Sequence, residues 1–185
     1  MAIVYSCNLQ KNLTKKDSCG YSLPEVKDIY IANFGDITDA PVDYDCESGV
    51  TISGISATTS ADTFFHIEPA KNSVTFTDEL VVEDNGNKYR THTITFNLSG
   101  KYDKDMVCPV DALALGRFFV VVVTADGEWL ALGRSTGLEA SAQSIAGGGD
   151  TNGVTVTLSA NVTESATPLN KTAQDELKAV VKKDA

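Results

Sequence analysis

The sequence is poor in the residue types and motifs that most catalytic and metal sites require. It contains 2 histidines, 4 cysteines and 1 tryptophan, and no two cysteines have the C-x-x-C spacing of zinc or redox sites. It has neither a G-x-x-x-x-G-K-[ST] phosphate loop nor a serine in a nucleophile-elbow context. We therefore expect a protein that is not an enzyme and that has no catalytic residues, cofactor or metal.

Long apolar stretches are also missing. No run approaches the roughly 20 apolar residues of a membrane-spanning helix, so we expect no membrane span. The N-terminal run Met1-Ala2-Ile3-Val4 is short and lacks the basic lead of a signal peptide. We therefore expect a protein made in a cytoplasm, where its cysteines stay reduced and pack as small hydrophobic residues. The formal net charge of −10 argues against affinity for nucleic-acid phosphates.

The apolar residues that are present follow the pattern of β-strands. Residues 118–123 form an unbroken and mostly β-branched run, which is typical of a strand covered on both faces. Asp126-Gly127 then predicts a hairpin turn that leads into a partner strand over residues 129–132. Further strands are predicted over residues 26–34, 50–57, 63–68 and 154–160.

The longest predicted element is a hairpin over residues 73–99. Apolar residues alternate with threonine and glutamate along both arms, so each arm has one apolar and one polar face. The pair Asn85-Gly86 suits a two-residue type I′ turn. An apolar face of this length needs to be covered, either by the body of the same chain or by a partner subunit.

Helical signals are few. Residues 109–116 predict a short helix, with Pro109 in its first turn and Gly116 at its end. Thr172 resembles a weak helix start in the tail. We therefore expect a mainly β fold, a sandwich or barrel with one long hairpin and one short flanking α-helix. The expected division is an N-terminal arm over residues 1–25, the β domain over residues 26–163 and a C-terminal extension, with a possible short helix, over residues 164–185.

The residues also leave other functions open. His66, Glu68 and His92 could hold a metal in an enzyme, although a surface or hydrogen-bonded histidine is the simpler interpretation. The aspartates of residues 35–46 could bind Ca²⁺, but that loop lacks the D-x-[DN]-x-[DN]-G pattern. A monomeric β-sandwich module that binds a carbohydrate or acts as an adhesin is the main alternative. Such a module favours an exposed aromatic platform, whereas Trp129 lies within an apolar strand.

Three stretches of the chain resemble the major tail proteins, or tail tube proteins, of long-tailed bacteriophages, particularly phages of Bacteroides-like gut bacteria. They are residues 20–34, which end in D-I-Y-I-A-N-F, residues 129–139, W-L-A-L-G-R-S-T-G-L-E, and residues 149–160, G-D-T-N-G-V-T-V-T-L-S-A. The resemblance implies a structural virion protein whose subunits form stacked, hexameric rings. These rings make a hollow tail tube, assembled in the host cytoplasm, with other copies, a tape measure protein and other tail proteins as partners. Double-stranded DNA passes through such a tube without specific binding.

The resemblance makes the hairpin over residues 73–99 the candidate for the element that forms the lumen and the contacts between subunits. A second inner hairpin could come from residues 50–68 or 129–160. Carboxylates on the lumen side would repel DNA phosphates, which helps a conduit to stay free of bound DNA. The candidate site residues of the hairpin are Asp78, Glu79, Glu83, Asn85 and Gly86.

Overall fold

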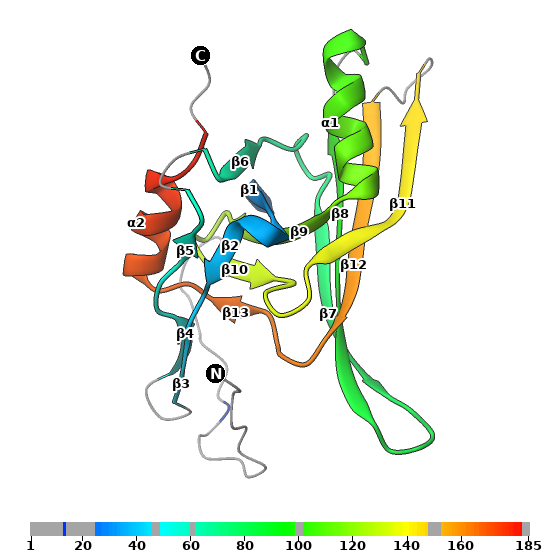
Figure 1. Ribbon diagram of the computed structural model, residues 1–185. Coiled ribbons are helices and arrows are strands. Elements are labelled where there is room, and N and C mark those ends of the chain that lie inside the picture. Colours follow the sequence, from blue (N-terminus) through cyan, green and yellow to red (C-terminus); the bar gives the residue numbers. More distant parts are fainter. Residues whose placement is uncertain are drawn as a thin grey trace, which may run out of the picture.

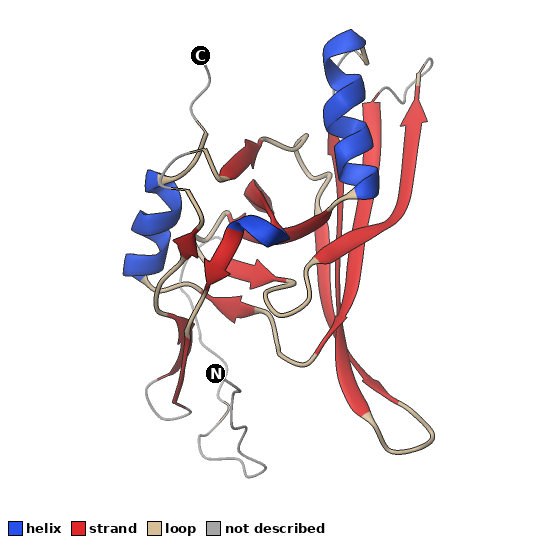
Figure 2. Ribbon diagram, in the orientation of Figure 1, coloured by secondary structure: helices blue, strands red, loops and turns tan. Residues whose placement is uncertain are grey.

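The computed structural model describes residues 13, 25–45, 49–59, 62–98, 102–147 and 153–182 (Figure 1). Within these ranges the protein is mainly β with antiparallel sheets, and α-helices pack against them (Figure 2), which confirms the expected fold class. The N-terminal arm expected over residues 1–25 lies outside the described residues, except for Leu13 and Glu25. Two parts of the stretches that carry the resemblance, residues 20–24 and 149–152, also lie outside them.

A central group of strands forms the middle of the molecule. Its members are β1 (Val26–Asn33), β6 (Phe64–Ile67), β9 (Arg117–Thr124), β10 (Trp129–Leu132) and β13 (Thr167–Pro168). β9 pairs antiparallel with β1 on one side and with β10 on the other. The side chains of residues 118–123 are all buried and alternate between two separate hydrophobic clusters. This arrangement confirms that the apolar run is a strand covered on both faces.

A second group of strands forms what we call the long sheet. Its members are β7 (Thr75–Val82), β8 (Lys88–Leu98), β11 (Leu138–Ala146) and β12 (Gly153–Val162), in the order β11-β12-β8-β7. β11 begins beside β9, where Leu138 pairs with Phe118, and then continues as the partner of β12. The long sheet therefore packs its apolar face on β1 and β9, and the first hydrophobic cluster lies between them.

Helix α1 (Lys104–Leu115) lies beside β11 (Figure 1) and is longer than expected. The prediction that this helix begins near Pro109 is wrong, because the Asp103 side chain caps the helix by accepting a hydrogen bond of 3.0 Å from the Asp105 N–H. Pro109 therefore lies inside the helix. Val110 and Leu113 are buried and join the first hydrophobic cluster.

Helix α2 (Lys171–Ala179) packs the tail onto the body. Its N-cap is Asn170, whose side chain accepts a hydrogen bond of 2.9 Å from the Ala173 N–H. The predicted start at Thr172 is therefore two residues too late. Leu177 is fully buried in the second hydrophobic cluster. The Lys182 N–H also donates to the carbonyl of Phe64 at 2.8 Å. Through β13 and α2, the tail therefore packs on the β body.

Two small two-stranded sheets flank the second hydrophobic cluster. They are made by the 3₁₀ turn η1 (Phe34–Asp36) with β2 (Ile37–Asp39) and β5 (Ser56–Ala57), and by β3 (Val42–Asp45) with β4 (Gly49–Ile52). The acidic loop expected over residues 35–46 is therefore largely strand, and the strand expected over residues 50–57 is divided in two. Of the described helices, none is both long and apolar enough to cross a membrane.

Candidate assembly surface

The β7–β8 hairpin projects beyond the body of the molecule (Figure 1). Its arms pair from Thr75 opposite Thr95 to Val82 opposite Lys88. The prediction of a two-residue type I′ turn is wrong. The Glu83 N–H donates to the Asn87 carbonyl, and the Gly86 N–H donates to the Glu83 carbonyl, both at 2.9 Å. Gly86 alone in this turn has a positive φ, of 85°. The connection is therefore a three-residue loop that ends in a left-handed glycine.

The register of the hairpin separates the predicted site residues. Glu79 lies on the same face as Thr75 and Thr77, opposite Thr91, whereas Asp78 lies on the face turned towards the body, opposite His92. The Asp78 side chain is only 15% exposed and is ion-paired. The expectation that Asp78 belongs with Glu79 to one acidic surface is corrected accordingly. The exposed carboxylates of the hairpin are those of Glu79, Glu83 and the loop residue Asp84.

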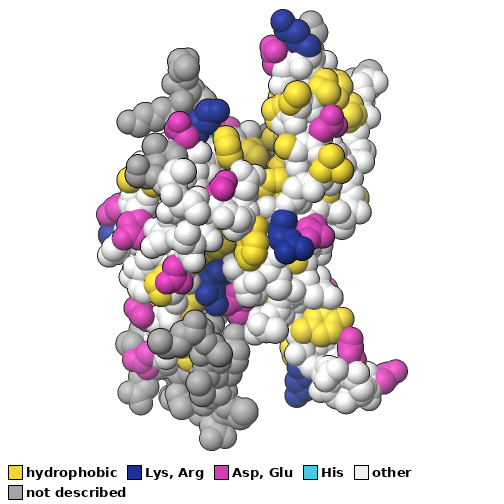
Figure 3. Space-filling view, in the orientation of Figure 1, with side chains coloured by type: hydrophobic (Ala, Val, Ile, Leu, Met, Phe, Trp, Pro, Cys, Tyr) yellow, Lys and Arg dark blue, Asp and Glu magenta, His cyan; other side chains and the backbone are white. Residues whose placement is uncertain are grey.

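The predicted turn residues bind one another. Asn85 Nδ2 donates to Glu83 Oε2 at 3.1 Å, and Asn85 Oδ1 accepts from the Asn87 N–H at 2.9 Å. Farther along β7, Leu80 and Val82 are each 56% exposed, and hydrophobic side chains are visible on the projecting hairpin in Figure 3. These residues continue the apolar face of the long sheet beyond the body, where nothing in the described chain covers them. The end of the hairpin is thus a hydrogen-bonded turn beside an uncovered apolar strip.

The opposite face of the long sheet, which we call the polar face, is covered with hydroxyl and amide groups that bind one another. Residues 75, 77, 79 and 81 of β7 share this face with the odd-numbered residues of β8 and β12. Along these three strands, Glu79 is the one acidic or basic side chain on the face. The hydrogen bonds across strands join Thr91 to Asn161 at 3.0 Å, Thr93 to Ser159 at 2.9 Å, Thr95 to Thr157 at 3.0 Å and Asn97 to Thr155 at 2.9 Å.

Both edges of the long sheet are open in the described part of the chain. β7 pairs with β8 alone, and β11 pairs with β12 alone after Glu139. An open edge presents a row of unpaired backbone N–H and C=O groups, which is a template for pairing with another chain. The long sheet is therefore a candidate surface for association.

A group of charged and polar residues, which we call the anchor cluster, joins the base of the hairpin to the body. Its members are Asp78, Arg90, His92, Arg134 and Glu164. Asp78 accepts a hydrogen bond of 2.6 Å from Arg90 Nε and another of 2.9 Å from the backbone N–H of Ala166. His92 is 1% exposed, and its Nδ1 atom accepts the Gly133 N–H at 3.2 Å.

The second half of the anchor cluster is a buried ion pair. Arg134 Nε donates to Glu164 Oε2 at 2.9 Å, and Arg134 Nη1 donates to the Ala40 carbonyl at 3.0 Å. Glu164 is 4% exposed, and its Oε1 atom and the His92 Nε2 atom are buried without a hydrogen-bond partner. The nearest carboxylate oxygen to His92 Nε2 is Asp78 Oδ1, at 3.4 Å.

Electrostatics in the anchor cluster shift two pKa values. Burial lowers the pKa of His92, although the carboxylates of Asp78 and Glu164 oppose this shift. Burial alone would raise the pKa of Asp78, but the hydrogen bonds from Arg90 and Ala166 and the nearby positive charges outweigh it, so this pKa is lowered. His92 is therefore neutral and Asp78 ionised at neutral pH.

The structure does not bring the candidate metal ligands together. His66 Nε2 lies 2.9 Å from Asp28 Oδ1, and its ring stacks on Tyr30 at a centroid distance of 4.9 Å. His92 belongs to the anchor cluster, on a different strand. The described residues contain no group of three or more His, Cys, Asp or Glu side chains that could hold a metal ion.

The tryptophan does not provide an aromatic platform in the described fold. Trp129 is buried and stacks on Tyr30 with a centroid distance of 5.2 Å. Lys178 of α2 covers it, with the Nζ atom 4.8 Å from the ring centroid. Trp129 is thus a packing residue that joins the central strands to α2.

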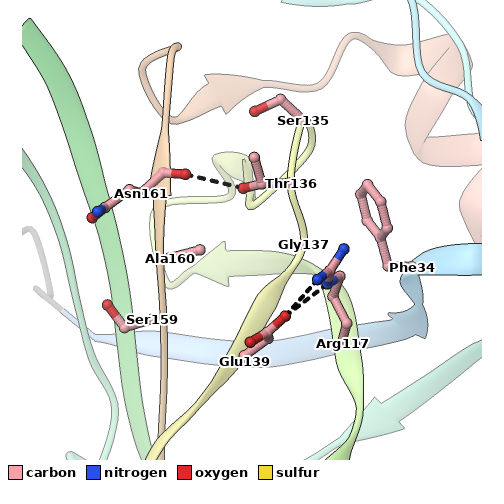
Figure 4. Close-up of a pocket in the computed structure, with 9 residues that line it drawn as sticks. All are labelled: Phe34, Arg117, Ser135, Thr136, Gly137, Glu139, Ser159, Ala160 and Asn161. Atoms are coloured by element: carbon pink, nitrogen blue, oxygen red, sulfur yellow. Dashed lines mark hydrogen bonds and ion pairs between the residues drawn. The ribbon is translucent and has the colours of Figure 1, made fainter.

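A hollow of about 440 Å³ lies where β11 crosses from the central strands to the long sheet (Figure 4). Arg117 and Glu139 face each other across it, with 2.7 Å between Arg117 Nη2 and Glu139 Oε1. Thr136 Oγ1 donates to the carbonyl of Asn161 at 3.2 Å. These polar groups of the hollow therefore bind one another.

Comparisons of the chain with models of known protein families, with curated proteins and with solved structures found no match. Sequence reasoning identified the hairpin and the alternation of its faces, but it did not identify the anchor cluster. The one available signal was the position of Asp78 between Phe76 and Leu80 on the apolar side of β7.

Proposed function

We propose that this protein is a structural subunit that assembles into rings, and that the rings stack into a hollow tube such as the tail tube of a long-tailed bacteriophage. The observation that carries the proposal is that the long sheet has two open edges, formed by β7 and by β11 beyond Glu139. Its four strands alternate in direction. Because four is an even number, β7 of one copy would run antiparallel to β11 of the next, and a ring of copies would form a closed antiparallel barrel without edges.

The two faces of the long sheet differ in a way that suits a barrel lining. Except at the projecting end of the hairpin, the apolar face is covered by the body of the same subunit, so the polar face is the one that would line the lumen. Its hydroxyl and amide groups are already bound to one another, as between Thr95 and Thr157. Glu79 adds negative charge, and the whole chain has a net charge of −10. Such a surface has little affinity for DNA phosphates or for a tape measure protein that must leave.

Electron microscopy of the purified protein in negative stain, at low and high salt, tests this function. Self-repulsion opposes assembly of an acidic subunit, and salt shortens the screening length from about 10 Å at 0.1 M to about 3 Å at 1 M. We expect rings or hollow tubes, favoured by salt. Small monodisperse particles under all conditions, together with binding to a glycan array, would instead favour the monomeric ligand-binding module.

A pair of substitutions at Leu80 tests whether the β7 edge makes the contact. The Glu83–Asn87 pair is hydrogen-bonded, so the alternation of an antiparallel ladder directs the N–H of residue 80 away from β8. Leu80→Pro removes that outward N–H, whereas the matched control Leu80→Thr keeps it and changes the side chain. We expect Leu80→Pro to abolish rings and Leu80→Thr to retain them, with both variants giving the wild-type circular dichroism spectrum. Normal tubes from a folded Leu80→Pro variant would show that β7 is not the contact edge.

A further inference from the structure

We propose that the anchor cluster is a pH-sensitive lock, which holds the base of the β7–β8 hairpin on the body while His92 is neutral and loosens it when His92 takes up a proton. The lock belongs to the single folded subunit. Its consequence for assembly, namely that acidification changes the direction of the hairpin, rests on the proposed function.

The hydrogen bond at His92 Nδ1 fixes the state of the ring. This atom accepts the backbone N–H of Gly133 at 3.2 Å and therefore carries no proton. The proton of the neutral ring is on Nε2, which lies 3.4 Å from Asp78 Oδ1. A second proton on Nδ1 would place two N–H donors against each other, so the bond to Gly133 is lost on protonation.

Gly133 packs closely against the start of β11. Its φ is 69°, and a Cβ atom at this position would lie 2.7 Å from Leu138 Cγ. Leu138 is fully buried and begins β11. Protonation of His92 therefore requires either rotation of the buried ring or displacement of the turn between β10 and β11.

Charged groups from each neighbouring element face the imidazole. Asp78 comes from β7, Arg90 from β8 and Glu164 from the connection between β12 and β13. Arg134, in the turn after β10, neutralises Glu164 through the buried ion pair. The two carboxylates attract a proton to His92 and Arg90 repels it, while burial disfavours the charged ring. While His92 is neutral, the two carboxylates and the two guanidinium groups of the anchor cluster balance in charge. A proton on His92 adds a positive charge and so disturbs the arrangement of these groups.

The anchor cluster joins three segments that are distant in sequence. Asp78 ties β7 to the backbone of Ala166, and His92 ties β8 to Gly133. Beyond residue 78, the tip-side half of β7 is held by its ladder with β8. Loss of the tie from His92 to Gly133 leaves Asp78 as the remaining tie of the hairpin base to the body, and it does not require the central strands to open.

Hydrogen–deuterium exchange measured by mass spectrometry tests the lock from about pH 7.5 to about pH 5.5, the range in which histidine titrates. The subunit is kept dilute at low salt, where its net charge of −10 opposes association, and rates are corrected for the intrinsic effect of pH. We expect exchange in residues 133–137 and 163–167 to become more than about threefold faster on acidification. His92→Gln, which does not titrate but can accept from Gly133 and donate to Asp78, should abolish the change. His66→Gln, the matched control at the other histidine, should preserve it.

The His66→Gln variant also leaves a single imidazole for NMR titration. We expect its midpoint to lie below the ordinary value of about 6.5 for histidine. A midpoint at or above that value, exchange that does not change with pH, or a pH response that persists in a folded His92→Gln variant would each overturn the lock. Because these measurements use the monomer, their failure leaves the tube proposal standing. Conversely, failure to form tubes leaves the lock intact.

Discussion

Asp78 and His92 are direct cross-strand partners in the β7–β8 hairpin, and Asp78 Oδ1 lies 3.4 Å from His92 Nε2. The neighbouring residue Glu79 lies on the opposite face of the same strand. One step along the chain therefore separates a carboxylate that ties the hairpin to the body from a carboxylate on the exposed polar face. The hairpin is anchored through one face, and its other face is free for contacts.

The free energy of unfolding should depend on pH in two separate windows. The pKa of folded His92 is below its unfolded value of 6.5, so stability falls as pH decreases from 6.5 towards the folded pKa. The pKa of folded Asp78 is below its unfolded value of 3.8, so its contribution is present above pH 3.8 and is lost as pH falls through the lower folded pKa. Urea unfolding across pH checks both windows. His92→Gln should flatten the first window alone, and an unaltered first window would contradict this assignment.

The buried pair of Arg134 and Glu164 should be strongly coupled. Arg134→Met leaves a carboxylate that is 4% exposed without its partner, which should cost about 3–5 kcal/mol of unfolding free energy. Adding Glu164→Leu should recover much of that loss, because the uncompensated charge is removed. Denaturant unfolding of both single variants and the double variant measures the coupling. Simple additivity of the two single losses would show that the pair is not a unit.

Docking of α2 should contribute substantially to stability. Leu177→Ala removes a fully buried side chain from the second hydrophobic cluster and should destabilise the protein by about 2–5 kcal/mol. Leu115→Ala is the chemically matched control, because Leu115 at the end of α1 is 89% exposed. We expect a change within about 0.5 kcal/mol for that variant. Equal effects in urea unfolding would mean that α2 is not an integral part of the body.

Substitutions at two glycines distinguish the energetic cost of backbone strain from that of steric overlap. Gly86→Ala places a side chain in open space at a φ of 85° and should cost about 1 kcal/mol. Gly137→Ala has a similar φ of 73°, but its Cβ would lie 2.3 Å from Arg117 Cγ. Overpacking should add about 1–3 kcal/mol to that loss. Thermal unfolding compares the two, and equal losses would show that the turn before β11 adjusts freely.

Charge on the polar face should affect DNA passage if the protein lines a conduit. Charge reversal by Glu79→Lys and Glu83→Lys should slow ejection of DNA through the assembled tube, because lysines on the lumen side attract phosphates. Glu128→Lys, on the turn between β9 and β10, makes the same change in charge elsewhere and should leave ejection unchanged. Ejection kinetics from particles carrying each variant provide the measurement. An unchanged rate in the Glu79→Lys, Glu83→Lys variant would count against a lumen role for these residues.

Local patterns in the sequence predicted many of the strands and their faces, but not β2 and β3, which lie in the expected acidic loop, nor β11. The apolar run over residues 118–123 is buried on both sides, and Phe76 and Ile94 share the apolar face of the hairpin. These features depend on a period of two, which each strand carries by itself. Errors arose where two local signals competed. Asp103 caps α1 ahead of Pro109, because an N-cap hydrogen bond can begin a helix that tolerates proline further along.

The register of the hairpin could not be predicted from the pattern of each strand alone. A two-residue turn at Asn85-Gly86 would pair Asp78 with Thr93, whereas the three-residue loop pairs it with His92. Apolar residues face apolar residues only in the observed register, as with Phe76 and Ile94. Cross-strand pairing and turn length must therefore be considered together.

Tertiary packing alone decided the remaining features. The anchor cluster combines residues from β7, β8, the turn after β10 and the connection after β12, and no spacing in the chain relates these segments. The same is true of α2, whose short apolar stripe became meaningful only when Leu177 entered the second hydrophobic cluster. Burial makes these contacts strong because it removes water from them. Burial is a property of the assembled core, so the sequence could specify the strands but not which polar residues would meet between them.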